Sequence, residues 1–94
     1  MEQFDWDEWK AAVNRAKHGV SFEEATSALR DPSRISRLDI DHADIEERVL
    51  TIGYSTRGRL LAVVTAETVE GIIRIISARR ATKRERHAYE TRSF

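Results

Sequence analysis

The arginines and lysines of the C-terminal third are the side chains best suited to chemistry on an anionic ligand. Residues 74–92 carry seven basic side chains and two acidic ones. Residues 74–80 place three arginines among small and branched apolar residues in the pattern of a strand, with Arg74 and Arg80 on one face and Arg79 on the other. A charge in the apolar part of a strand is costly unless it is paired or reaches a ligand. The pattern therefore indicates an anion site at the edge of a sheet.

Further cations follow in a predicted helix and a predicted hairpin. Lys83 and Arg84 fall in the first turn of the helix, where the helix dipole disfavours cations. Positive charge at that end indicates a candidate anion site. Arg57 and Arg59 of the hairpin extend the basic surface. The alternative is that nearby carboxylates pair with these cations and water solvates the rest. The carboxylates concerned are Glu67, Glu70 and Glu85.

RNA is the ligand that suits such a surface. Lysine and arginine neutralise backbone phosphates, and aromatic rings stack on unpaired bases. Tyr54 and Tyr89 are the candidate stacking rings, whereas Trp6, Trp9 and Phe22 are expected in the core. The predicted RNA-binding residues are Arg57, Arg74, Arg80, Lys83, Arg84, Arg86 and Tyr89.

Cleavage of RNA without a metal needs three kinds of group. A base activates the ribose 2′-hydroxyl, cations stabilise the charge that develops on the phosphate, and an acid protonates the leaving 5′-oxygen. Glu47 or His18 is the candidate base, and His42 or Tyr89 is the candidate acid. The predicted catalytic residues are Glu47, Arg48, Arg59, Arg79 and His18.

Motifs for other chemistries are missing from the sequence. It has no Gly-rich phosphate loop, no His-x-x-x-His pair and no nucleophile elbow. It also has no cysteine, which excludes disulfides, thiolate catalysis and Cys-based zinc sites. The acidic segment 39–44 holds oxygen ligands for a divalent ion, but it lacks the glycine and glutamate spacing of a calcium loop. We therefore predict a solvated loop there, with no metal and no other cofactor.

The charges are unevenly distributed along the chain, although the formal net charge is zero. Residues 1–47 hold 12 acidic and 6 basic side chains, whereas residues 48–94 hold 4 acidic and 10 basic ones. A polarised chain can present a positive face to phosphate despite a neutral total. The alternative is that folding interleaves the two halves and cancels the asymmetry.

The length and composition are those of a small globular domain. Its 94 residues are 40% hydrophobic and 34% charged, and a chain of this size forms one domain, residues 1–94. The longest apolar run, residues 60–64, is far shorter than a membrane span, and the N-terminus is acidic where a signal peptide would be basic. We expect a soluble, cytoplasmic protein without membrane contact.

Two short helices are predicted near the N-terminus. Asp5 is the expected cap of the first, in which Trp6, Trp9 and Val13 recur at helical spacing and form an apolar stripe with Ala16. Gly19 ends this helix in a left-handed conformation. Ser21 is the expected N-cap of the second helix, and Glu24 is expected to complete a capping box with it. The helix ends at Asp31-Pro32, and its apolar face consists of Phe22, Ala25, Ala28 and Leu29.

The rest of the chain predicts an antiparallel sheet and a final helix. Residues 34–39 alternate as an edge strand, and residues 48–54, 59–66 and 72–79 are rich in branched residues. Their hairpin-length connections require antiparallel neighbours. Thr82 and Glu85 form a capping box for a helix that reaches about Thr91. The expected fold is α+β, with two helices, three or four antiparallel strands and a C-terminal helix.

Three blocks of the sequence resemble the BrnT family of toxins. The first comprises Phe4-Asp5-Trp6-Asp7 with Lys10, and residues 14–25, NRAKHGVSFEEA. The second comprises Glu47-Arg48, Ile52-Gly53 and Arg57-Gly58-Arg59-Leu60. The third comprises residues 74–82, RIISARRAT, with Glu85-Arg86 and Tyr89. The blocks stand in the family's order and cover residues 4–90.

The resemblance implies a RelE-like ribonuclease that cuts RNA, arrests translation and belongs to a type II toxin–antitoxin pair. It further implies a BrnA-type antitoxin with a ribbon-helix-helix domain, which neutralises the toxin and carries the complex to operator DNA. The alternative functions are a non-catalytic module that binds nucleic acid through the same basic surface, and a protein-docking module that uses the polarised charge.

Overall fold

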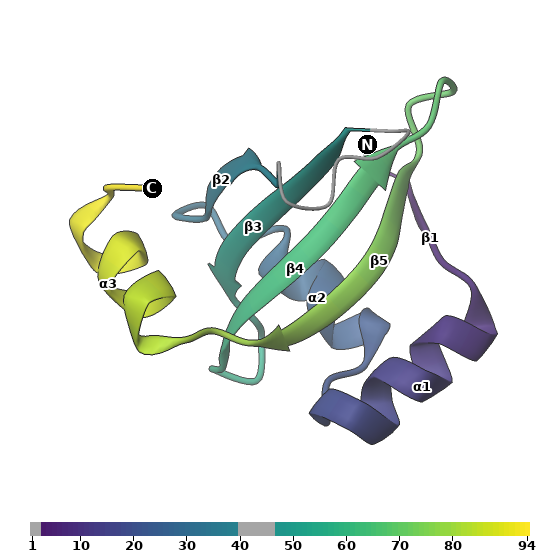
Figure 1. The fold of residues 1–94 in the computed structure, drawn as a ribbon, viewed down its shortest axis with the longest axis horizontal. Helices are drawn as coiled ribbons and strands as arrows, with labels where there is room; N and C mark the ends of the chain where they lie inside the picture. Colours follow the sequence, from purple (N-terminus) through teal and green to yellow (C-terminus); the bar gives the residue numbers. More distant parts are fainter. Residues whose placement is uncertain (1–2, 40–46) are drawn as a thin grey trace.

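A computed structural model describes residues 3–39 and 47–94 of the chain. The elements are, in order, β1 (Phe4–Asp5), α1 (Glu8–His18), α2 (Phe22–Ala28), β2 (Ile35–Leu38), β3 (Arg48–Tyr54), β4 (Leu60–Glu67), β5 (Ile73–Arg80) and α3 (Lys83–Thr91). The strands form one sheet in the order β1-β5-β4-β3-β2 (Figure 1). The α+β class is confirmed, but the described residues contain five strands rather than three or four. None of their helices has the length and apolar character that a membrane span requires.

Four of the strands are antiparallel neighbours, and for β3, β4 and β5 this pairing was predicted from their short connections. β2 pairs with β3, β3 with β4, and β4 with β5. Gly58, at a φ of 77°, supplies the left-handed residue of the β3–β4 turn. The strand that the sequence analysis missed is β1, which pairs parallel to β5 through two residues. So short a strand has no periodicity of its own, and therefore only its partner reveals it.

A bulge in β5 changes the predicted faces of its arginines. Val64 lies opposite Ser77 and Thr65 opposite Ile75, so that Ile76 is an extra residue in β5. Ile75 and Ala78 consequently lie in the same core beneath α1 and α2. By alternation from these residues, Arg74 and Arg79 lie on the other face of the sheet, and Arg80 lies on the helix face. The prediction that Arg74 and Arg80 share a face is wrong because it assumed an uninterrupted strand.

The main core lies between the sheet and the first two helices. Phe22, Ala25 and Ala28 of α2 are fully buried, and they pack with Leu61 and Val63 of β4. Gly53 of β3 allows the close approach of α2, because a Cβ atom at that position would collide with a backbone carbonyl oxygen of the helix. The predicted apolar face of residues 22–29 is therefore confirmed.

The start and the outer face of α1 differ from the prediction. The N-cap is Asp7, whose side chain accepts hydrogen bonds from Trp9 N and Lys10 N. Asp5 does not cap the helix because it belongs to β1. Trp9 is 76% exposed and Val13 47% exposed, so this part of the expected apolar stripe faces away from the core, whereas Trp6 packs against it. The predicted C-terminal Gly19 is confirmed, with a φ of 69°.

Residues at the starts of α1 and α2 make contacts that differ in part from the predicted ones. Trp6 lies before α1 and packs edge-to-face on Phe22, with 6.0 Å between ring centroids. Ser21 caps α2 as predicted by accepting from Glu24 N. The side chain of Glu24 instead lies buried against Arg59, so the expected second half of this capping box is replaced by a long-range ion pair.

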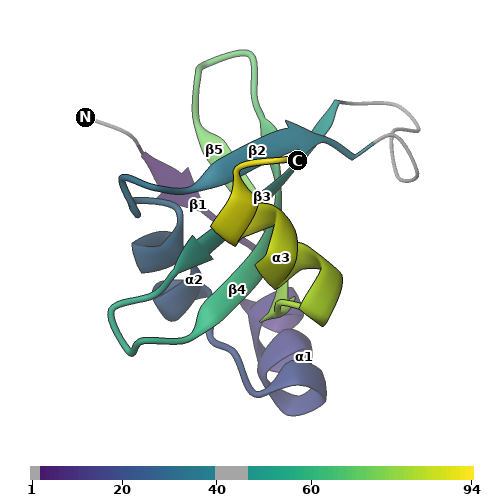
Figure 2. The same cartoon turned by 90° about the vertical axis from the view of Figure 1, so that its left-hand side faces the viewer.

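The third helix covers part of the opposite sheet face. A second core there contains Leu50, Ile52, Leu60 and Ala62, and Tyr89 of α3 packs against it. α2 and α3 accordingly lie on opposite sides of β4 (Figure 2). The capping box of Thr82 and Glu85 is present in both directions, as predicted. This half-covered face is where the sheet remains open to ligands.

Candidate active site

A groove of about 360 Å³ lies on the sheet face beside α3. Its floor is formed by β3, β4 and β5, and its walls come from β2, from α3 and from the end of α1. The charged and titratable residues that line it are His18, Arg37, Asp39, Arg48, Arg79 and Glu85. Apolar contacts come from Leu50, Val64 and Ile76. The groove thus brings together three guanidinium groups, an imidazole and two carboxylates.

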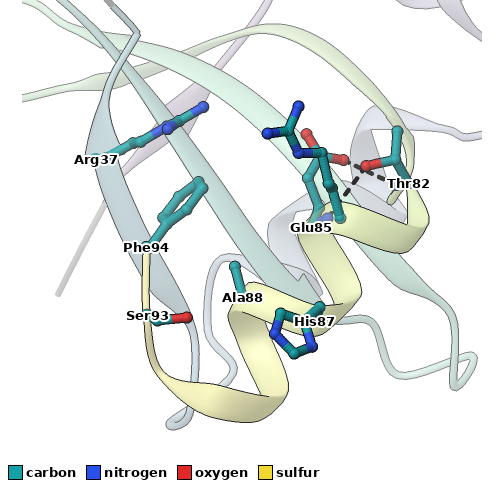
Figure 3. A pocket seen from close by; sticks show the side chains of 8 residues that line it. Arg37, Thr82, Glu85, His87, Ala88, Ser93 and Phe94 are labelled. Carbon is teal, nitrogen blue, oxygen red and sulfur yellow. Dashed lines mark hydrogen bonds between the residues drawn. The ribbon is translucent and has the colours of Figure 1, made fainter.

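A second hollow, of about 470 Å³, adjoins this groove and shares Arg37 and Glu85 with it. Figure 3 shows Arg37 and Phe94 on one side of this hollow, facing Glu85 and Ala88 of α3. The guanidinium carbon of Arg37 lies 4.5 Å from the centre of the Phe94 ring, a cation–π contact. Arg84 and His87 also line the hollow. Basic side chains therefore continue from the groove along α3.

The central cation of the groove, Arg79, is held by a two-point ion pair. Its Nη1 donates to Oε1 of Glu85 at 2.7 Å, and its Nη2 donates to Oε2 at 2.9 Å. Oε1 also accepts from Thr82 N at 2.9 Å, so the carboxylate that caps α3 also orients the arginine. Paired N–H bonds of this kind fix the plane of the guanidinium. Arg79 therefore has a defined orientation while its side chain remains 39% exposed.

The protonation state of this pair follows from its contacts. Burial disfavours the charged form of Glu85, but the hydrogen bonds from Arg79 and Thr82 outweigh it and lower the pKa of the carboxyl. The same hydrogen bond, which Arg79 donates to Glu85, raises the pKa of Arg79, and the nearby charge of Asp39 adds to this effect. Both members are consequently charged at neutral pH. Glu85 is therefore occupied as an ion-pair partner and is not available as a base.

His18 reaches the groove from the last residue of α1, and Asn14 fixes that helix to β5. Asn14 is 6% exposed, and its Nδ2 donates to the carbonyl oxygens of Val20 at 2.9 Å and Ala78 at 2.8 Å. Its Oδ1 accepts from Ala78 N at 3.1 Å. The amide thus pairs with one residue of β5 as a neighbouring strand would. Because His18 lies one helical turn after Asn14, it shares the inward face of α1.

The other two arginines of the groove come from β2 and β3. Arg48 opens β3, and the predicted catalytic residue Glu47 precedes it on an exposed position that is not part of the groove lining. Arg37 lies opposite Leu50 in the β2–β3 ladder, which puts it on the same face. Sequence reasoning missed Arg37 because it read residues 34–39 only as an edge strand. Its place in the alternating pattern, opposite an inward-facing leucine, was the available signal.

Arg59, also predicted to be catalytic, lies away from the groove on the helix side of the sheet. Its Nε donates to Oε2 of Glu24 at 2.9 Å, its Nη2 contacts Oε1 of the same carboxylate, and Nη2 also donates to Gly19 O at 3.1 Å. Ser55 Oγ donates to Glu24 at 2.7 Å. Arg57 lies 3.6 Å from the same carboxylate. This cluster ties the α1–α2 junction to the β3–β4 turn.

The hydrogen bonds of this cluster keep Glu24 ionised. The bond from Arg59 is the main cause that lowers the pKa of Glu24, although burial opposes it, and the bond from Ser55 acts in the same direction as Arg59. Arg59 and Glu24 are 35 positions apart in the sequence. No local motif relates residues at that separation, so the pattern of the chain did not reveal the pair.

The predicted RNA-binding residues occupy several separate places. Arg74 contacts Asp5 of β1 at 3.3 Å, and Arg86 donates to Tyr54 Oη at 2.9 Å. Arg80 and Lys83 are exposed on either side of the β5–α3 connection, whereas Arg84 lines the second hollow. The predicted basic positions therefore do not form one continuous patch among the described residues.

Tyr89, predicted to bind RNA or act as an acid, lies between α3 and the rest of the fold. Its hydroxyl donates to Oδ2 of Asp31 at 2.7 Å, and its ring packs edge-to-face on Tyr54 at 5.3 Å. Burial and the bond to Asp31 raise the pKa of Tyr89. The tyrosine holds α3 against the sheet. The other candidate acid, His42, lies outside the described residues, as do Asp41 and Asp44 of the predicted acidic loop.

Within residues 3–39 and 47–94, no group of three or more metal-binding side chains is arranged to hold an ion. The cations of the open groove beside α3 are the side chains of Arg37, Arg48 and Arg79, which are suited to binding an anion.

Comparisons with known proteins show a family match and similarity to solved structures. Residues 6–85 match the family described as "Ribonuclease toxin, BrnT, of type II toxin-antitoxin system". The crystal structure of the Brucella abortus ribonuclease toxin BrnT is similar, with a TM-score of 0.64 and 24% sequence identity over 88% of this chain and 100% of that one. This likeness shows the fold. No curated protein sequence matches the chain.

Proposed function

Because the chain belongs to the BrnT family of ribonuclease toxins of type II toxin–antitoxin systems, we propose that it cleaves RNA in the groove beside α3. The observation that carries this proposal is the convergence of His18, Arg37, Arg48 and Arg79 on one open sheet face. These residues come from α1, β2, β3 and β5, so that the fold, and not a local motif, assembles the set.

The cations of the groove match the charge of a phosphodiester in the transition state. As the ribose 2′-oxygen attacks phosphorus, negative charge grows on the non-bridging oxygens, and fixed positive groups stabilise it. Arg79 is held in place by Glu85 and presents a fixed guanidinium. Arg37 and Arg48 lie beside it in the same groove. We assign phosphate binding to these three arginines.

His18 is the base that fits the groove best. Of the two candidate bases, His18 lines the groove and Glu47 does not. A neutral imidazole takes the proton of the 2′-hydroxyl, the 2′-oxygen bonds to phosphorus, and the bond from phosphorus to the 5′-oxygen breaks. The 5′-oxygen takes up a proton from water in this open groove. The products are a 2′,3′-cyclic phosphate and a 5′-hydroxyl end.

The same arrangement supports cleavage without a metal ion. Three guanidinium groups supply the positive charge that a divalent cation supplies to the phosphate in metal-dependent nucleases. We therefore expect RNA cleavage to continue when EDTA removes divalent ions.

The partner of a type II toxin is an antitoxin, and this chain therefore has one. We propose that it is a BrnA-type protein with a ribbon-helix-helix domain, and that the toxin reaches operator DNA only within their complex. The proposal rests on the resemblance of the three sequence blocks. We expect the pair to act in the cytoplasm, where the RNA substrates are.

Two substitutions in the groove and one outside it test the assignment. We expect His18→Gln and Arg48→Gln each to lower the rate of RNA cleavage by about 100-fold or more, the usual effect of removing a base or a transition-state cation. Arg30→Gln is the matched control, because Arg30 lies after α2 with its guanidinium over the Phe4 ring, outside the groove. Circular dichroism checks that each variant is folded. Full activity in both groove variants would contradict the assignment.

A further inference from the structure

The outer face of α1 carries an apolar stripe that the fold leaves uncovered. Trp9 is 76% exposed and Val13 is 47% exposed, and Ala12 and Ala16 are exposed beside them. Positions 9, 12, 13 and 16 share one side of a helix. That side is opposite Asn14, which fixes the helix to β5. A contiguous exposed apolar patch of this kind is a feature of interaction sites, whereas a single exposed apolar residue is not.

A shallow groove continues the stripe toward α2. It has a volume of about 390 Å³ and lies between the two helices. Its lining residues are Glu8, Ala11, Ala12, Arg15, Ala16, Ser21, Phe22 and Glu23. The small side chains of the alanines form the floor of the groove, and the larger side chains of Trp9 and Val13 lie beside it. A ridge beside a groove is the surface that a second helix packs against.

Charged residues flank the stripe with different signs on its two sides. On the helical wheel Lys10 and Lys17 lie on the side away from α2. On the side toward α2, Glu8, Arg15 and Glu23 line the groove. A complementary helix therefore carries acidic residues on one flank and is free to carry basic residues on the other.

We propose that this surface, formed by the α1 stripe and the α1–α2 groove, docks an amphipathic helix of the antitoxin. The helix has apolar residues at i, i+3, i+4 and i+7, which fill the groove and cover Trp9, and aspartate or glutamate over Lys10 and Lys17. The proposal rests on the membership in a toxin–antitoxin family, because that membership supplies the partner.

Charge favours this occupant over a second copy of the chain. The surface carries three exposed cations, Lys10, Arg15 and Lys17, and two exposed anions, Glu8 and Glu23. Two copies of α1 placed face to face bring together an excess of positive charge, whereas an acidic helix neutralises it. α1 has 11 residues and is about 16 Å long. A stripe of that length is short for a symmetric dimer but sufficient as the anchor of a longer antitoxin chain.

The stripe is also separate from the groove that we assign to RNA. His18 faces the sheet, whereas Trp9 and Val13 face outward on the same helix. Substitutions in the stripe are therefore expected to change antitoxin binding and to leave the cleavage rate of the free toxin as it is. This separation makes the two proposals independent in experiment.

Dissociation constants for the cognate antitoxin test the surface. We expect Trp9→Glu and Val13→Glu each to weaken binding by about 30-fold or more, as at the centre of a protein interface. Glutamate in the first turn suits the helix dipole, so that Trp9→Glu keeps the helix. Val69→Glu is the matched control, because Val69 is fully exposed in the β4–β5 connection. We expect it to bind like the wild type.

A charge reversal and an activity assay complete the test. Lys10→Glu with Lys17→Glu should weaken antitoxin binding and reduce its salt dependence. Wild-type dissociation constants for both stripe variants would overturn the proposal. If the wild type is a dimer that dissociates on Trp9→Glu substitution while the antitoxin affinity is unchanged, the surface binds a second copy of the chain instead. If the stripe variants lose RNA binding, the surface binds RNA instead. If the wild type fails to cleave RNA, the proposed function fails, but the comparison of antitoxin affinities still stands.

Discussion

Replacing Asn14 by leucine should be among the most destabilising single substitutions in this fold. The amide makes three hydrogen bonds to backbone groups of Val20 and Ala78. Both residues are fully buried, so that water cannot replace the lost partners. Each buried polar group left without a partner costs about 1–3 kcal/mol. The three groups together predict a loss of about 3 kcal/mol or more, out of a total stability of about 5–15 kcal/mol.

Equilibrium unfolding in urea measures this loss. With an m value of about 1.5 kcal/mol/M, a loss of about 3 kcal/mol lowers the unfolding midpoint by about 2 M. Lys10→Leu is the matched control, since it places the same side chain on the exposed side of α1 and should change the stability by less than about 0.5 kcal/mol. If Asn14→Leu and Lys10→Leu have the same midpoint, the reasoning that Asn14 joins α1 to β5 is refuted.

Three further predictions test other parts of the fold. Gly53→Ala should destabilise the protein by about 2 kcal/mol, measured by urea unfolding, because its Cβ would collide with α2. Tyr89→Phe should lower the free energy of unfolding by about 1–2 kcal/mol, because the hydrogen bond to Asp31 is lost, and should leave the RNA cleavage rate unchanged. A cleavage rate near zero in a folded Tyr89→Phe variant would show that Tyr89 is catalytic. The pKa of Glu24 lies below its ordinary 4.5 in the folded chain, so its stabilisation is complete at neutral pH and is lost as the pH falls below 4.5. Glu24→Gln should therefore reduce the decrease of the urea unfolding midpoint between pH 7 and pH 3. The same decrease as in the wild type would count against the ion pair.

Local signals predicted much of the secondary structure. The strand over residues 48–54 was predicted with its observed bounds, because branched residues and short turns mark it in the sequence. Thr82 and Glu85 are three positions apart, and both halves of their capping box formed. In each case the interacting groups lie within one element or one turn. Interactions between residues so close in the chain can be predicted from the sequence pattern.

Features that depend on distant partners could not be predicted in the same way. Asp5 has the type and spacing of a helix cap, but pairing with β5 draws it into β1 and leaves the cap to Asp7. The bulge at Ile76 reverses the faces of the arginines that follow it. His18, Arg48 and Arg79 were among the residues predicted from the sequence to be catalytic, and the fold brings these three into one groove.

The chemistry of the RNA ends tests the central claim most directly. Purified toxin, freed from its antitoxin, is incubated with RNA in EDTA, and the new ends are identified by mass spectrometry. Attack by the 2′-hydroxyl in a groove lined by His18 and three arginines predicts 2′,3′-cyclic phosphate and 5′-hydroxyl ends that form without divalent ions. Cleavage that stops in EDTA and leaves 5′-phosphate ends when magnesium is present would contradict the account.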